Sequence, residues 1–532
     1  MGATDEVAET EQNNNVDGGK DDEDESGGGV HEEKENEDQH ENKDNQQSQL
    51  SVARLQSPSP APPLQVVVSR DAPQATPLSV ISSQATPLSV PFSTPQGSIG
   101  SRAASLNRTA CTDGVTLMFF IVHLLVVLVA MSYFTMKAIQ LAIRDGKHMV
   151  LLQYWVPQIS VAAFAAFVFA TVWQQCIRRW PGEMVRLILW SGCGINFVAG
   201  LLLICFSIPA CAGAGFVLLF FSICQALYAC WVNPRIEYAM RILRKAMETS
   251  SKFPQLSRPC YSILFIALVW ACLWGLTVVG ALSFYFPPLT IIGLILSLAW
   301  TMEVLRNIVV ITVSRVISLF YLRGMQASVQ FSFHRAITMT LGTACLGSLC
   351  VPTIEALRII ARALNLLEGE DEFMFSCAHC CYRVMEVIFR YGNNWAFVWV
   401  ATYGRGFVSA SRSCYELFQR NGMEPLLDSD ITSSLCFLSG VSTGSLCVII
   451  CGSWTFSIRR DFTVTVSLIS FFIGYLMTRI SLALPQACVS AYYVCYAENP
   501  QSRFFDQTIP ERMELIANGG DKTAVRLTAY SR

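Results

Sequence analysis

Long apolar runs with almost no charged residues are the feature that most restricts what this chain can fold into. They begin at Gly114 and recur as far as residue 490. Each run is close to the roughly 20 residues that a membrane-crossing helix needs. In lipid, backbone N–H and C=O groups need internal hydrogen-bond partners, and a helix supplies them within one segment. The runs therefore predict an all-α, polytopic membrane protein.

We predict about ten transmembrane helices, two of which are unusual. The segment 384–403 is interrupted by Glu386, Arg390, Asn393 and Asn394. The segment 289–320 is overlong, since its helix would rise about 48 Å against a hydrocarbon core of about 30 Å. Part of it must tilt, break or protrude. The ten expected spans are 114–136, 152–173, 187–207, 212–232, 261–283, 289–320, 338–362, 384–403, 433–456 and 463–490.

The N-terminal part has a different composition. Residues 1–48 hold 17 Asp/Glu against 3 Lys/Arg, and residues 49–110 are rich in Ser, Pro and Thr. Neither part can bury enough apolar surface to offset its conformational entropy, so we expect a disordered tail. The expected organisation is a cytosolic tail at 1–110, a ten-span domain at 111–490 and a cytosolic C-terminal tail at 491–532. The acidic tail is a candidate for recruiting trafficking partners, and no nucleic acid is expected as a partner.

Charge bias between the expected loops predicts the orientation. Five connections hold 19 Lys/Arg, and the five opposite ones hold 6. Because cytoplasmic loops are enriched in Lys and Arg, both termini should be cytosolic. The plasma membrane is the expected location, with an endomembrane as the alternative.

The segment 233–250 predicts an amphipathic helix that extends the fourth span. Its Arg235, Arg241, Arg244 and Lys245 could meet the headgroups of anionic membrane lipids. A loop that only sets the topology explains them equally well.

Two common enzyme motifs are missing from the sequence. It contains no GxxxxGK[ST] phosphate loop and no HExxH metal pair. The pattern GxSxG occurs at Gly440–Gly444, but inside the apolar run 433–456, whereas a nucleophile elbow needs a strand-to-helix turn. The cluster Cys377, His379, Cys380 and Cys381 has metal-ligand residue types but lacks a second pair at zinc-finger spacing. Thiol packing or lipidation is the favoured interpretation. We expect no catalytic residue, no metal and no cofactor.

Polar residues inside apolar spans are costly and usually face a cavity. Trp300, Glu303 and Asn307 lie at helical offsets 0, 3 and 7, hence on one face. Arg306 is close enough to Glu303 to neutralise it, so the alternative is an ion pair that only holds the helices in place.

A second cluster, YGNNWAFVWVATYGRGF at 391–407, repeats an aromatic residue at every fourth position: Tyr391, Trp395, Trp399 and Tyr403. Asn393 and Asn394 mark where its helix starts or breaks. A quaternary ammonium cannot donate a conventional hydrogen bond, and is recognised by aromatic faces with a nearby negative charge. The ladder is therefore a candidate wall for an organic cation. Interfacial anchoring or helix packing by the rings is the alternative.

Three blocks of the sequence resemble the choline transporter-like family. They are WTMEVLRNIVVITVSRVISLFYL at 300–322, FHRAITMTLGTACLGSLCVPTIEALRII at 333–360 and RYGNNWAFVWVATYGRGFVSASRSCYELF at 390–418. The chain departs from the family pattern at Val310, Arg315, Arg405–Gly406 and Val408. It is similar to a divergent member, with plant-like features in its long acidic tail and compact loops.

The resemblance implies movement of choline or a related organic amine by alternating access, without ATP. It implies Trp300, Trp395, Trp399 and Tyr403 as ring walls, Glu303 as the negative charge and Asn307 as a residue that orients the backbone; Asn394 completes the expected substrate-binding set. A different class of function stays open, namely a non-transporting membrane organiser or lipid-homeostasis protein.

Overall fold

The computed structural model describes residues 112–144, 146–282, 284–367, 384–385 and 387–518. The expected tail at 1–110 and the Cys377–Cys381 cluster lie outside these residues. Helices account for all regular structure in the described part, so the all-α fold class is confirmed. The elements are α2 (Gly114–Arg144), α3 (Gly146–Arg179), α4 (Pro181–Cys205), α5 (Pro209–Ser251), η1 (Pro254–Leu256), α6 (Ser257–Ala281), α7 (Pro287–Arg323), α8 (Val329–Thr338), α9 (Leu341–Leu367), α11 (Ala396–Tyr403), α12 (Phe407–Arg420), α13 (Glu424–Asp428), α14 (Thr432–Ile458), η2 (Arg460–Phe462), α15 (Thr463–Ser481), α16 (Ala483–Glu498) and α17 (Thr508–Ala517).

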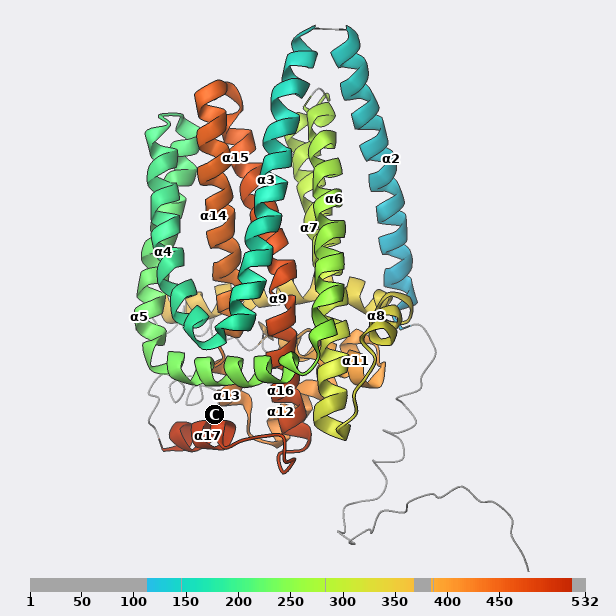
Figure 1. Ribbon diagram of the computed structural model, residues 1–532, viewed down its shortest axis with the longest axis vertical. Coiled ribbons are helices and arrows are strands. Elements are labelled where there is room, and N and C mark those ends of the chain that lie inside the picture. The colour runs from blue at the N-terminus through green and yellow to red at the C-terminus, as the bar shows by residue number, and fades with distance from the viewer. Residues whose placement is uncertain (1–111, 145, 283, 368–383, 386, 519–532) are drawn as a thin grey trace, which may run out of the picture. The chain divides into compact units, whose positions relative to one another are not determined.

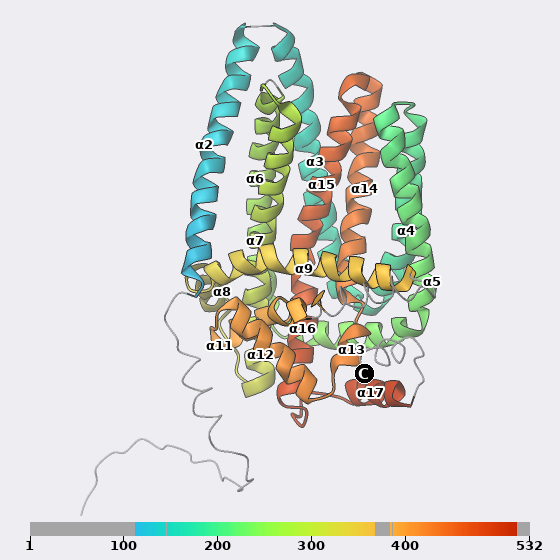
Figure 2. The same cartoon turned by 180° about the vertical axis from the view of Figure 1, so that it is seen from behind.

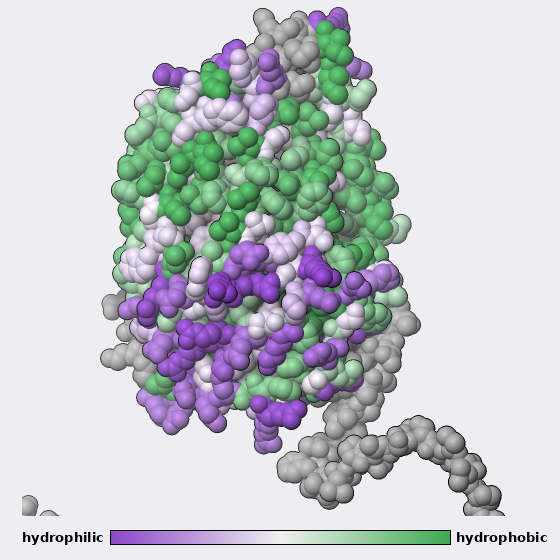
Figure 3. Space-filling model, in the orientation of Figure 1, coloured by the Kyte–Doolittle hydropathy of each residue, from purple (hydrophilic) through white to green (hydrophobic). Residues whose placement is uncertain are grey.

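A bundle of long apolar helices confirms a polytopic membrane protein. Within the described residues, eight helices are long and apolar enough to cross a membrane, and a bent pair of α8 and α9 would add a ninth. The eight are α2 to α7, α14 and α15, and they stand side by side in the upper part of Figures 1 and 2. Figure 3 shows apolar side chains covering this part of the visible face, while polar side chains gather at the lower end.

Two of the ten expected spans take another form. The segment 338–362 belongs mainly to α9, which bends from α8 by 74° and lies across the bundle in both views (Figures 1 and 2). The expected span at 384–403 is not one continuous helix. Residues 387–391 are helical, the helix breaks at 392–395, and α11 after the break has only 8 residues, a rise of about 12 Å that is too short to cross the hydrocarbon core by itself. The buried Asn393 sets its start, because the Asn393 Oδ1 accepts a hydrogen bond from the Ala396 backbone N–H at 3.0 Å.

The two longest helices extend beyond the bundle. α7 has 37 residues and protrudes at the lower end of the molecule, as its expected excess length required (Figure 1). α5 has 43 residues, with Pro234 inside it, and the part after this proline turns across the lower end (Figure 1). Proline removes a backbone donor and bends a helix. The expected helical extension at 233–250 is confirmed, because α5 continues to Ser251.

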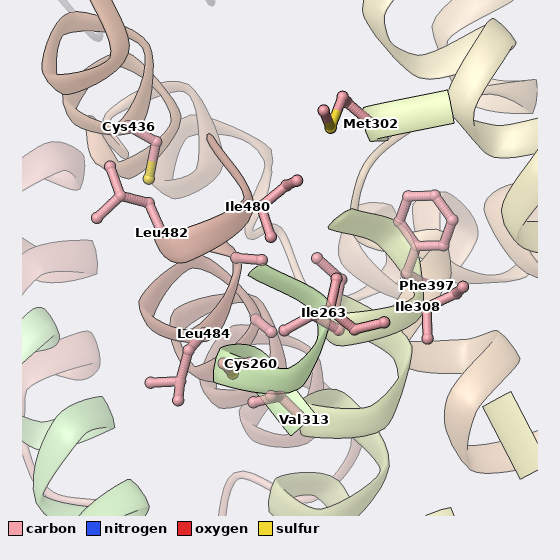
Figure 4. Packing of buried hydrophobic residues seen from close by; sticks show 14 of the residues in the cluster. Cys260, Ile263, Met302, Ile308, Val313, Phe397, Cys436, Ile480, Leu482 and Leu484 are labelled. Carbon is pink, nitrogen blue, oxygen red and sulfur yellow. The ribbon is translucent and has the colours of Figure 1, made fainter. Parts of the chain in front are cut away.

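One hydrophobic core joins the bundle to the shorter helices below it. Figure 4 shows Cys260 and Ile263 of α6 among side chains of α7, α11, α14, α15 and α16, such as Ile308, Phe397 and Ile480. α16 is buried along nearly its whole length, and α17 contacts α5 and α13. Residues 491–517, expected as part of a C-terminal tail, thus contribute two packed helical segments to the lower end.

Candidate functional site

A buried charge network connects three helices at the centre of the molecule. Glu303 on α7 accepts hydrogen bonds from Arg306, one turn along the same helix, and from Arg479 on α15 at 3.3 Å. The side chains of Glu303 and Arg306 are 11% and 2% exposed. Arg306 also donates to the Oδ1 of Asn307 at 3.3 Å and to the Oε1 of Gln486 on α16. The predicted pairing of Glu303 with Arg306 is confirmed, and Arg479 is an unforeseen second partner.

Beside this network lies a cavity of about 450 Å³. Its wall includes the rings of Phe221 and Tyr228 from α5, Phe437 from α14 and Tyr475 from α15. Phe437 stands edge-on to Phe221 at 6.1 Å and to Tyr475 at 6.0 Å between ring centroids. Four aromatic side chains from three helices therefore surround one space, which is large enough for a small organic ligand.

The polar part of the cavity wall contains both signs of charge. Glu355 comes from α9, Arg479 from α15 and Gln486 from α16. The guanidinium carbon of Arg479 is 6.0 Å from the centroid of the Tyr475 ring. Arg479 and Gln486 are also members of the charge network, so that network borders the cavity directly.

Sequence reasoning missed this cavity, although one signal was present. Glu355 and Arg479 are ionisable residues inside apolar runs, which marks a candidate functional position in a membrane segment. The aromatic side chains gave a weaker signal. Phe221 and Tyr228 lie seven residues apart on one face of α5, but Phe437 and Tyr475 come from α14 and α15, so spacing along the sequence could not join the four rings.

Trp300 lies elsewhere, where α7 meets α2 and α9. Its Nε1–H donates to the Oγ of Ser348 at 3.0 Å. Its ring is 4.4 Å from the His123 ring and 5.3 Å from the Phe120 ring. These contacts make Trp300 part of a packed aromatic cluster with α2, and it does not line the cavity described above.

The aromatic ladder is divided by the start of α11. Trp395 precedes the helix and packs edge-on against Phe389 at 6.0 Å and Phe418 at 5.7 Å. Trp399 and Tyr403 share the helix and lie 4.8 Å apart. The expected single helical face of four rings is therefore reduced to one pair.

The Trp399–Tyr403 pair has charged neighbours of its own. The Arg405 guanidinium lies 5.8 Å from the Trp399 ring centroid, and the Tyr403 hydroxyl donates to Glu498. Trp399 and Arg405 line a small cavity of about 120 Å³ together with Glu416. A hydrogen bond from Arg412 at 2.8 Å holds the pKa of Glu416 below its ordinary value, so this carboxylate is ionised but paired.

Two expected site residues carry buried polar atoms that have no hydrogen-bond partner in the described part of the chain. They are the Oδ1 of Asn394 and the Nε1–H of Trp399. The seven expected residues thus have three separate sets of partners: Trp300 with α2, Glu303 and Asn307 in the charge network, and Asn394, Trp395, Trp399 and Tyr403 around α11.

Comparison with known proteins identifies the family to which this chain is related. A family model described as plasma-membrane choline transporter matches residues 216–501. A CTL-like protein of Dictyostelium discoideum is 26% identical over 319 residues, which cover 57% of this chain and 55% of that protein. Protein PNS1 of Debaryomyces hansenii is 20% identical over 65% of this chain and 74% of its own length. Protein PNS1 of Kluyveromyces lactis is 22% identical over 67% of this chain and 71% of its own length.

The chain spans about half the length of the Dictyostelium relative. The family match covers more than half of the 532 residues, and it contains the charge network and the cavity from Phe221 to Gln486. This integral, multi-pass membrane protein therefore belongs to the plasma-membrane choline transporter family.

Proposed function

We propose that the protein moves choline or a related organic amine across a membrane by alternating access, without ATP, and that the cation binds in the cavity between α5, α9, α14 and α15. The observation that carries the proposal is the combination of Phe221, Tyr228, Phe437 and Tyr475 with the Glu355 carboxylate around one space. Aromatic faces and a nearby negative charge are what recognise a quaternary ammonium. The family description points to the same class of ligand.

Glu303 has an indirect role in this proposal. It holds Arg479 by an ion pair at 3.3 Å, while Glu355 supplies the carboxylate of the cavity wall. The formal charges of Arg306, Arg479, Glu303 and Glu355 sum to zero, so net charge alone does not attract the cation. Its affinity then depends on the rings, each contributing about 0.5–2 kcal/mol as a cation–π partner.

The pair of α8 and α9 is the element that we propose to move during transport. α9 supplies Pro352, Glu355 and Ala356 to the cavity wall, and it meets α8 at a 74° bend. A hinge needs only a few residues at the end of an element to absorb a change in backbone angles. Movement of α9 would open the cavity towards the lower end, as alternating access around a fixed site requires.

Uptake of radiolabelled choline into liposomes that contain the purified full chain, without ATP, tests the proposal. Tyr475→Leu should weaken choline binding by about two- to thirty-fold, the range of one cation–π contact, and Tyr475→Phe should weaken it less. Glu355→Gln should weaken choline more than its uncharged isostere 3,3-dimethylbutan-1-ol. Tyr285→Leu is the matched control, because Tyr285 is an exposed aromatic residue between α6 and α7.

Absence of choline uptake and of choline binding by folded wild-type protein would contradict the proposal and favour a non-transporting membrane organiser. Uptake that is unchanged in both Tyr475→Leu and Glu355→Gln would leave transport in place but move the site away from this cavity.

A further inference from the structure

Three exposed arginines lie at the lower end without an ion pair among the described residues. Arg179 is the last residue of α3, Arg186 lies in the second turn of α4 and Arg244 lies in the part of α5 that crosses the lower end. The Arg244 guanidinium rests on Gly182, since a Cβ built at that glycine would be 2.6 Å from its Nη2. We call Arg179, Arg186 and Arg244 the arginine cluster.

The neighbouring basic residues differ from the cluster because the protein itself pairs them. Arg241 contacts Glu237 at 2.6 Å and Glu511 of α17 at 3.4 Å. Lys245 contacts Glu248 at 3.6 Å and Asp506 at 3.5 Å. Arg235 is buried, with its guanidinium over the ring of Trp231 at 4.9 Å.

The surface around the cluster matches the level of lipid headgroups. The turn between α3 and α4 lies where the apolar surface of the bundle gives way to the polar lower end (Figures 1 and 3). Trp180, in that turn, is 58% exposed, and Leu187 and Trp190 are exposed further along α4. Exposed Trp is typical of the membrane interface. Apolar side chains therefore continue along α4 from the arginine cluster.

We propose that the arginine cluster binds the headgroup of an anionic phospholipid, whose acyl chains lie along the exposed face of α4. Guanidinium groups donate paired hydrogen bonds that fit phosphate oxygens. Glu183, which is also exposed in this turn, reduces the three positive charges to a net +2. The lipid would hold α4 and α5 together at the headgroup level, and α5 carries Phe221 and Tyr228 of the cavity. The binding itself does not depend on the transport of choline.

Native mass spectrometry of the purified full chain tests the site, with phosphatidylinositol 4-phosphate as the probe and phosphatidylcholine of the same acyl chains for comparison. The anionic lipid should bind more tightly. Each arginine near an anionic headgroup contributes about fivefold in affinity. The triple variant Arg179→Gln, Arg186→Gln, Arg244→Gln should thus lose up to about a hundredfold by the same reasoning. Arg241→Gln, on the same stretch of α5 but paired with Glu237 and Glu511, is the matched control and should bind like wild type.

A second variant leaves every charge in place. Gly182→Ala puts a methyl group where the Arg244 guanidinium rests. The flexible end of Arg244 must shift, so lipid affinity should fall by up to about fivefold, the share of one arginine, with an unchanged melting temperature.

Three results would overturn the lipid site. In the first, the triple variant binds the anionic lipid like wild type. In the second, Arg241→Gln loses as much affinity as the triple variant does. In the third, soluble inositol 1,4-bisphosphate binds as tightly as the lipid, which would exclude any contribution from acyl chains on α4.

Discussion

At the scale of single residues, Glu303 stands out because its one carboxylate forms ion pairs with two arginines. Arg306 and Arg479 approach it from α7 and α15. Removing one partner of a buried ion pair is costly, because the remaining charge stays in a medium that solvates it poorly. The network therefore stabilises one position of α7 relative to α15.

We expect Glu303→Gln to destabilise the protein by about 3–5 kcal/mol, since it leaves the buried Arg306 and the partly buried Arg479 without their carboxylate. The double variant Glu303→Gln, Arg306→Gln should recover part of this loss by removing one of the stranded charges. Unfolding of the purified protein in detergent measures both. A single variant as stable as wild type would show that water or another group already neutralises the arginines.

The Trp399–Tyr403 pair differs from the cavity rings in the space beside it. Trp399 lines a cavity of about 120 Å³, whereas Tyr475 lines the cavity of about 450 Å³. We therefore expect Trp399→Leu to weaken choline binding less than Tyr475→Leu does. Binding of labelled choline to the two purified variants makes the comparison. The opposite ranking would place the ammonium at α11, as the sequence-based hypothesis proposed.

At the scale of elements, close backbone contacts fix how the helices pack. A Cβ at Gly280 of α6 would come within 1.9 Å of the Phe134 carbonyl oxygen of α2. Small residues are common where membrane helices approach this closely. The contact matters for the fold because only 17% of the apolar stretch of α2 is buried in the protein.

Gly280→Ala should force α2 and α6 apart and cost roughly 1–3 kcal/mol, as overpacking typically does. Gly293→Ala on α7 is the matched control, since nothing lies within 4 Å of its Cβ position. Its better helix propensity should stabilise the protein slightly, by up to about 1 kcal/mol. Melting temperatures in detergent compare the two. Equal effects of both substitutions would contradict the packing shown by the structure.

At the scale of the whole molecule, the described part begins and ends on one side. The first residues of α2 and helix α17 both lie at the lower end (Figures 1 and 2). The Lys/Arg excess of the sequence falls mainly in connections at this end, including the extension of α5 and the turn between α3 and α4. We propose that this end faces the cytosol.

The sequon Asn107-Arg108-Thr109 checks the orientation. With the lower end in the cytosol it should carry no glycan, because the glycosylation machinery acts on the opposite face of the membrane. A glycosidase-induced shift in gel mobility of protein from intact cells is the measurement, and a sequon engineered into the turn between α4 and α5 is the positive control. Glycan on Asn107 together with none at the control would invert the proposed topology.

The sequence alone determined the fold class and most of the long helices. Eight apolar runs became upright helices because desolvation of the backbone in lipid is a local requirement that each run satisfies by itself. The pairing of Glu303 with Arg306 was equally predictable, because the two residues are three positions apart on one helix and so lie on the same face. Local spacing also located the break at Asn393, although it did not show that the helix after the break would be too short to cross the membrane.

Only the tertiary structure decided what lies far apart in sequence. Arg479 meets Glu303 across 176 positions. Asp113 accepts a hydrogen bond from the Phe407 N–H across 294 positions, and so caps α12, whose own first residues offer no side-chain cap. The cavity takes its rings from α5, α14 and α15 and its carboxylate from α9. Such contacts depend on how the helices rotate and cross when they pack. Neither the hydropathy nor the periodicity of the sequence specifies that packing.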